Sequence, residues 1–250
     1  MDENGQLLYL RATVAYDGAG YLGFQCQAKG HTVQGALEAT LGRIARRAVR
    51  VVGAGRTDSG VHAQGQVIGF ELAWRHSLAE LQRALNAELP EDIVVLDVGP
   101  AEPGWHPRFS ARRRHYRYTI LNQPLRSPLE RRHACHVAAP LDVPAMQAAA
   151  RCLEGVHDFA AFGRPAPDHS AERIIYSATW QASEPWLIFD IVGNAFLRGM
   201  VRRLVGSMLQ VGLGAWPAGQ LQAVLESRKM ELAAPPALAC GLCLMRVEYE

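Results

Sequence analysis

One carboxylate stands inside a glycine-rich stretch, GAGRTDSGVHAQGQ (53–66), that directly follows an apolar run. It belongs to Asp58, and Arg56 precedes it by two residues. A dinucleotide fingerprint needs a third glycine at the position of Asp58 and a Walker loop needs Gly-Lys-Ser/Thr, so the stretch does not predict a phosphate site. A strand ending in glycine-rich backbone presents its carboxylate at a sheet edge, where the glycines let a bulky ligand approach. Asp58 is therefore a catalytic candidate; a turn Asp that caps its own loop is the alternative.

A single carboxylate is suited to covalent catalysis, because paired acid and base work needs a second carboxylate nearby. An arginine must then keep the nucleophile ionised in a dry pocket. Arg56 and, in space, Arg202 are the candidates. Arg202 lies on a helix that we expect to start at Leu197, where it and Arg198 border an apolar face at helical spacing. Two arginines that reach out to solvent are the alternative.

Arginines and aromatic residues are interleaved in RFSARRRHYR (108–117), a pattern typical of nucleic-acid contacts. A second arginine cluster, RIARRAVR (43–50), has a solvated helix face as its alternative. Tyr116 and Tyr118 alternate with Arg117 on an expected strand, so both tyrosines face one side of the sheet. They could stack on bases, and two core tyrosines are the alternative.

Composition indicates a folded protein of the reducing cytoplasm. The chain has 250 residues, 49% of them hydrophobic and 20% charged, which excludes a disordered protein. The acidic N-terminus lacks the features of a secretory signal, and arginines interrupt the longest apolar helical segment, so we expect no membrane span. Five scattered cysteines argue against a disulfide framework, and the nine histidines show no metal-site signature. His62 is expected to be a structural hydrogen-bonding residue rather than a ligand.

The elements that position these residues repeat one order. Strands and helices alternate as β-α-β-β-α-β in residues 1–107, with Thr32 as the cap of the first helix and a capping box from Ser77 to Glu80. Residues 108–250 repeat this order with one additional helix, so each half is a split β-α-β candidate in an α+β protein. Residues 1–107 carry nine basic and twelve acidic side chains, net −3, whereas 108–250 carry seventeen and twelve, net +5. Loops 123–140 and 163–171 look like insertions that contact a ligand.

Four blocks of the chain together resemble one protein family. The block GRTDSGVHAQGQV (55–67) resembles the signature of the TruA family of tRNA pseudouridine synthases, and three further blocks match in the family's order. These three are AYDGAGYLGFQCQ (15–27), RRRHYRYTI (112–120) and GNAFLRGMVRRLVGSM (193–208).

The resemblance implies an isomerase that converts uridine to pseudouridine at positions 38, 39 and 40 of the tRNA anticodon arm, without metal or cofactor. It assigns the nucleophile to Asp58, packing on the target base to Tyr116, pairing with the carboxylate to Arg202, and displacement of the target nucleotide to Arg56. It also implies a pseudouridine synthase fold, in which two ferredoxin-like halves share a mainly antiparallel sheet, and a homodimer. The N-terminal half, 1–107, would carry the catalytic Asp, and the more basic half, 108–250, would complete the cleft.

The chain departs from the family pattern at a few positions and leaves other functions open. Ser59 stands where Ala is frequent, Phe24 where Trp is frequent, and Cys243 where Tyr is usual; none of these changes removes a proposed catalytic group. A non-catalytic RNA-binding protein is the alternative from another class, because doubled sheets with aromatic and Arg faces also serve as binding modules. A nucleotide hydrolase that releases free uracil is a third possibility.

Overall fold

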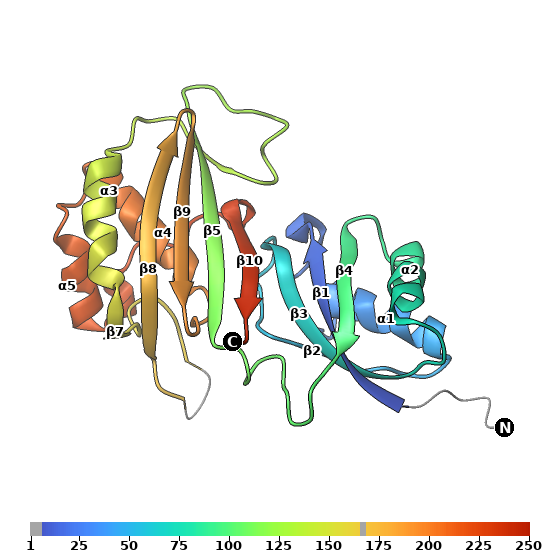
Figure 1. The fold of residues 1–250 in the computed structure, drawn as a ribbon. Coiled ribbons are helices and arrows are strands. Elements are labelled where there is room, and N and C mark those ends of the chain that lie inside the picture. The colour runs from blue at the N-terminus through green and yellow to red at the C-terminus, as the bar shows by residue number, and fades with distance from the viewer. Residues whose placement is uncertain (1–6, 166–168) are drawn as a thin grey trace. The chain divides into compact units, whose positions relative to one another are not determined.

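The fold is described from a computed structural model, which covers residues 7–165 and 169–250. The chain divides into two compact units (Figure 1). Unit 1 consists of Met1–Arg112 together with Leu244–Glu250, and unit 2 of Arg113–Cys243. The C-terminal segment therefore leaves unit 2 and ends in unit 1.

Unit 1 has the order β-α-β-β-α-β that the sequence predicts. Its elements are β1 (Leu7–Tyr16), α1 (Val33–Ala45), β2 (Val51–Gly53), β3 (His62–Ala73), α2 (Leu78–Glu88) and β4 (Ile93–Pro100). The strands lie in the order β4-β1-β3-β2, and every pairing among them is antiparallel. The second part of β10 (Leu242–Glu248) lies beside β3, where a Cβ on Gly65 would come 2.4 Å from the carbonyl oxygen of Met245.

Alternation and capping explain these elements. Every second residue of β1 from Leu10 to Tyr16 is buried, as expected for a strand with one face on a core. The side chain of Thr32 accepts a hydrogen bond from the amide of Gly35 and starts α1. Ser77 and Glu80 form the predicted capping box of α2. The helices bury leucines against the sheet, namely Leu37, Leu41, Leu81 and Leu85.

Unit 2 is built on the strand order β5-β9-β8-β7, in which all pairings are antiparallel. These strands are β5 (Arg113–Asn122), β9 (Trp186–Gly193), β8 (Glu172–Ser183) and β7 (Gly155–Asp158). The predicted hairpin of β8 and β9 is confirmed. Two short strands were not expected: β7, and β6 (Cys135–Val137), which pairs in parallel with β5 and lies inside the predicted loop 123–140. Residues 166–168 of the predicted loop 163–171 lie outside the described residues.

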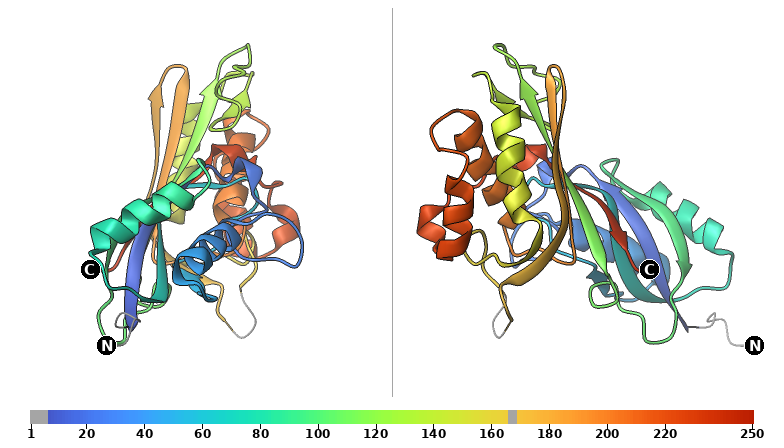
Figure 2. Two further views of the ribbon diagram at one scale, coloured as in Figure 1. Left: turned by 90° about the vertical axis from the view of Figure 1, so that its right-hand side faces the viewer. Right: turned by 60° about the vertical axis from the view of Figure 1, so that its left-hand side comes forward.

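Three helices lie together on one face of the unit 2 strands (Figure 2). They are α3 (Val143–Ala150), α4 (Met200–Gly212) and α5 (Gln220–Ser227). The expected start of α4 at Leu197 is wrong. Gly199 has a φ of +72° and caps the helix, so the helix begins at Met200 and Arg198 precedes it.

The α+β class with a mainly antiparallel sheet is thus confirmed. All five cysteines are free thiols. None of the helices within residues 7–165 and 169–250 combines the length and apolarity needed to cross a membrane.

Candidate active site

The loop that carries Asp58 connects β2 to β3, and its first half is held by β3. The amide of Ala54 donates to the carbonyl of Val67 at 2.8 Å. The side chain of Gln66, fully buried, donates from Nε2 to the carbonyl of Gly55 at 2.9 Å. These contacts fix the backbone immediately before Arg56, whose side chain is exposed.

The second half of the loop is held by the segment that leads from β1 to α1. The amide of Phe24 donates to the carbonyl of Thr57 at 3.1 Å, and the hydroxyls of Thr57 and Tyr16 lie 2.8 Å apart. The carbonyl of Tyr21 accepts two hydrogen bonds, from the amide of Gly60 at 3.3 Å and from the hydroxyl of Ser59 at 3.1 Å. Asp58, which is half-buried, therefore lies between two residues whose positions are set by neighbouring backbone.

Two glycines allow the two segments to approach each other. A Cβ on Gly23, whose φ is +97°, would lie 2.7 Å from the carbonyl oxygen of Thr57 and 3.2 Å from the carbonyl carbon of Asp58. A Cβ on Gly18 would lie 2.0 Å from the carbonyl oxygen of Val61. Both positions require glycine because backbone meets backbone there.

His62, the first residue of β3, contacts the turn that follows β1. It is buried, and its Nδ1 lies 3.1 Å from the amide of Gly18, which donates to it, and 3.0 Å from a carboxylate oxygen of Asp17. The same Asp17 oxygen accepts from the amide of Ala19 at 2.9 Å. The imidazole thus connects the first residue of β3 to the end of β1.

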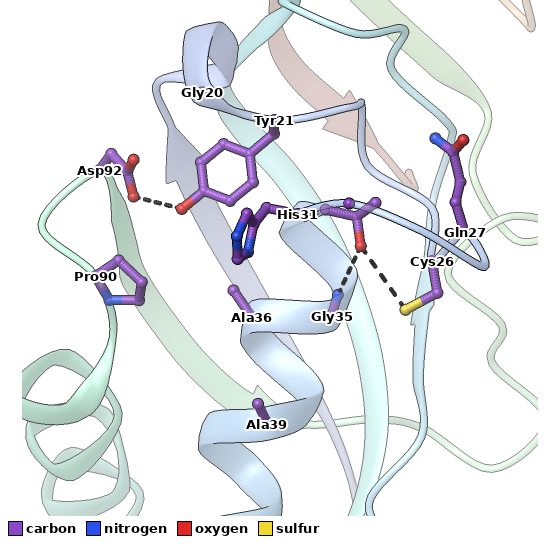
Figure 3. A pocket seen from close by; sticks show the side chains of 12 residues that line it. Gly20, Tyr21, Cys26, Gln27, His31, Gly35, Ala36, Ala39, Pro90 and Asp92 are labelled. Carbon is purple, nitrogen blue, oxygen red and sulfur yellow. Dashed lines mark hydrogen bonds between the residues drawn. The ribbon is translucent and has the colours of Figure 1, made fainter.

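A cavity of about 520 Å³ is lined by the β1–α1 segment, by α1 and by the turn that precedes β4 (Figure 3). Small residues of α1 form one wall, and Tyr21, His31, Pro90 and Asp92 border it. The phenol of Tyr21 donates a hydrogen bond of 2.5 Å to Asp92 (Figure 3). Burial, this hydrogen bond and the negative charges of Asp92 and Asp17 raise the pKa of Tyr21 well above its ordinary value, so the phenol stays a proton donor.

Unit 2 contains the other two predicted site residues. Tyr116 on β5 is buried, with 8% of its surface exposed, and its ring packs edge-on against Phe196 with the centroids 5.1 Å apart. Phe196 belongs to the segment between β9 and α4. This segment is held by Arg114, which donates to the carbonyl of Asn194 at 2.5 Å.

Arg202 lies in the first turn of α4. Its Nε donates to the carbonyl of Ala237 at 2.8 Å, while its own carbonyl accepts from the amide of Ala237 at 2.9 Å. The phenol of Tyr118 donates to the next carbonyl, that of Leu238, also at 2.8 Å. Burial raises the pKa of Tyr118 far above its ordinary value, and this tyrosine, fully buried, is a core residue. Segment 237–238 is thus bound to both α4 and β5.

The predicted site residues therefore fall into two groups. Arg56 and Asp58 share one loop of unit 1, and Tyr116 and Arg202 belong to unit 2. Sequence reasoning missed the residues that hold the Asp58 loop: Tyr16, Tyr21, Thr57 and Gln66. Two of them, Thr57 and Gln66, stand within the glycine-rich stretch itself, and this proximity was the signal that could have found them.

Comparison with known proteins assigns the chain to a family. The sequence model of a family described as tRNA pseudouridine synthase matches residues 12–110 and 149–250. The chain belongs to the tRNA pseudouridine synthase family, and the predicted class of enzyme, an isomerase that forms pseudouridine in tRNA, is confirmed.

Individual relatives agree over almost the whole chain. A tRNA pseudouridine synthase A from Moorella thermoacetica is 42% identical over 243 residues, which cover 96% of this chain and 99% of the relative. The protein of the same name from Roseiflexus sp. is 44% identical over 242 residues, with coverage of 94% and 88%. The one from Geobacillus sp. is 40% identical over 243 residues, with coverage of 96% and 98%. The predicted resemblance to the TruA family is thus confirmed.

Proposed function

We propose that this protein converts uridine to pseudouridine at positions 38, 39 and 40 of the tRNA anticodon arm, with Asp58 as the nucleophile. The observation that carries the proposal is the construction of the Asp58 loop. It matches the family's signature. Hydrogen bonds from Phe24 and Gln66 fix its backbone on both sides of Arg56, and the hydroxyls of Tyr16 and Thr57 are hydrogen-bonded to each other. A fixed carboxylate is what covalent catalysis requires, because a poorly oriented nucleophile loses most of the rate advantage of a bound substrate.

The reaction breaks the bond between C1′ of the ribose and N1 of uracil and forms a bond between C1′ and C5. The hydrogen on C5 leaves as a proton and N1 gains a proton, so the product is an isomer of the substrate and the reaction needs no redox partner. The target nucleotide is paired or stacked, and turning it out costs a few kcal/mol. Arginine contacts to phosphates offset this cost, and we assign displacement of the nucleotide to Arg56.

Three side chains then act on the extruded uridine. Asp58 reacts with the nucleotide, Tyr116 packs against the uracil ring while it rotates, and Arg202 keeps the carboxylate ionised after water has been excluded. The burial of Tyr116 and its edge-on contact with Phe196 support its role, because a ring held in one orientation can support a flat base.

Substitution of Asp58 tests the proposal. We expect Asp58→Ala to abolish pseudouridine formation, measured as tritium released from tRNA labelled at C5 of uridine, while the variant still binds tRNA. Asp58→Asn serves as the isosteric variant and should be equally inactive. Product formation by Asp58→Ala at the wild-type rate would refute the catalytic assignment.

The same experiment separates the alternatives. A non-catalytic RNA-binding protein would bind tRNA and release no tritium with the wild-type chain, whereas a nucleotide hydrolase would produce free uracil that chromatography detects. Transcripts that retain uridine at one of positions 38, 39 or 40 identify which positions react.

We further propose, on the family resemblance, that the protein is a cytoplasmic homodimer made of two ferredoxin-like halves, 1–107 with Asp58 and the more basic 108–250. The composition supports the difference in charge between the halves. Light scattering combined with gel filtration measures the mass of the assembly and would show a monomer if the proposal of a dimer is wrong.

A further inference from the structure

Tyr21 connects the loop of Asp58 to a distant part of unit 1. Its ring is buried, with 8% of its surface exposed, and its phenol donates a 2.5 Å hydrogen bond to Asp92 (Figure 3). At the other end of the residue, the Tyr21 carbonyl accepts from the amide of Gly60 and the hydroxyl of Ser59. Tyr21 thus contacts Asp92 through its side chain and the Asp58 loop through its backbone carbonyl.

The Asp92 end of this connection is firmly held. Asp92 precedes β4, and its carbonyl accepts from the amide of Asp17 at 2.9 Å. The next residue, Ile93, pairs with Tyr16 at the end of β1. The acceptor of the phenol is therefore part of the sheet framework rather than a mobile loop.

The Asp58 end of the connection is short and close-packed. Ser59 directly follows Asp58, and the carbonyl of Asp58 accepts from the amide of Val61 at 3.1 Å, which closes a turn. Gly23, two residues after Tyr21, contacts the backbone of Thr57 and Asp58 without room for a side chain. A displacement of Tyr21 must therefore move the backbone that carries Asp58.

We propose that Tyr21 is a positioning residue for Asp58: the hydrogen bond from its phenol to Asp92 fixes the carbonyl that holds Ser59 and Gly60 and thereby orients the carboxylate. The inference rests on the proposed role of Asp58 as the nucleophile. It assigns the Tyr21–Asp92 pair to the reaction step rather than to tRNA binding.

The test is Tyr21→Phe, which keeps the ring and removes only the hydroxyl. We expect kcat to fall about tenfold with KM for tRNA unchanged within twofold, because a misplacement of about 1 Å costs on the order of 100-fold and the ring still limits the shift. Asp92→Ala, which removes the acceptor, should reproduce this loss. Asp92→Asn retains an oxygen that accepts from the phenol and should retain most of the wild-type kcat.

Tyr249→Phe is the matched control. It removes another phenol of unit 1 that donates a hydrogen bond, at 2.8 Å, to the carbonyl of Pro107. We expect its kcat to equal that of the wild type. Thermal denaturation of all variants shows how much each substitution affects stability.

The kinetic constants of the four variants test whether Tyr21 positions Asp58. A lower kcat at constant KM for Tyr21→Phe and Asp92→Ala, with Asp92→Asn and Tyr249→Phe near wild type, supports the proposal. An unchanged kcat, a change confined to KM, or an equal loss in Tyr249→Phe would overturn it. Product formation by Asp58→Ala would instead show that the proposed function itself is wrong, so the two failures can be told apart.

Discussion

Replacing Gly23 by alanine probes the packing that holds the candidate catalytic loop. The φ of +97° is one that L side chains rarely adopt, and holding alanine there costs about 1–3 kcal/mol. The added Cβ would also lie 2.7 Å from the carbonyl oxygen of Thr57. Ordinary van der Waals contact begins at about 3.4 Å, so the two backbones must separate by at least roughly 0.7 Å, and Asp58, next to Thr57, moves with it.

Two measurements check this expectation. Strain of this size lowers the melting temperature by about 2–12 °C for a chain of this length. If both backbones give way, Asp58, the proposed nucleophile, moves by roughly half an ångström, and kcat falls by about tenfold, measured by tritium release. Gly20→Ala, on the same segment, is the control, because its Cβ would have Asp92 Oδ2 as nearest neighbour at 4.0 Å. If Gly23→Ala melts and reacts like Gly20→Ala, the close approach described for Gly23 does not control the loop.

Two further substitutions test unit 2. Burial tends to raise the pKa of Asp190, but hydrogen bonds from Arg117 and His115 outweigh burial and hold this pKa below its ordinary value. The ionised Asp190 therefore stabilises the fold above about pH 4, and this stabilisation is lost as the pH falls through the pKa of the folded protein. Asp190→Asn should cost about 1–3 kcal/mol at pH 7 and much less near pH 3 in urea unfolding, and an equal cost at both pH values would contradict the ion pair. Tyr116→Phe should keep substantial activity if the ring supports the base, whereas complete loss of tritium release with normal circular dichroism would indicate that the phenol transfers a proton.

Local signals were sufficient to predict the strands and helices of unit 1 from β1 to β4. Alternation along β1 and the capping side chains Thr32 and Ser77 act over a few residues, and the structure contains each of them where the sequence places it. Local consistency of this kind is what makes an element readable from its own residues.

Unit 2 was harder because its deviations depend on single residues and distant partners. The apolar periodicity of α4 extends back to Leu197, which is buried. Gly199, however, has a positive φ, so the helix begins only at Met200. Strand β6 has three residues and exists because it pairs with β5, so its own sequence carries no recognisable pattern.

The candidate site also has a part that the sequence predicts and a part that it does not. Asp58, Arg56, Tyr116 and Arg202 were named from motif residues, but the contacts that hold Asp58 join residues far apart in the chain. Tyr16 reaches Thr57 across 41 positions and Ser59 reaches Tyr21 across 38. Periodicity and spacing describe neighbours along the chain, and therefore such contacts are visible only after folding.

The glycines around Asp58 have different physical reasons. A Cβ on Gly53 would lie 2.5 Å from the ring of Phe24, one on Gly65 would lie 2.4 Å from the Met245 carbonyl, and Gly60 has a φ of +77°. Packing or conformation therefore accounts for these three without any ligand. For Gly55 a Cβ would meet no heavy atom within 4 Å in the described part of the chain. Gly55 directly precedes the exposed Arg56 and its carbonyl is held by Gln66, so neither packing nor a positive φ explains a glycine at this position.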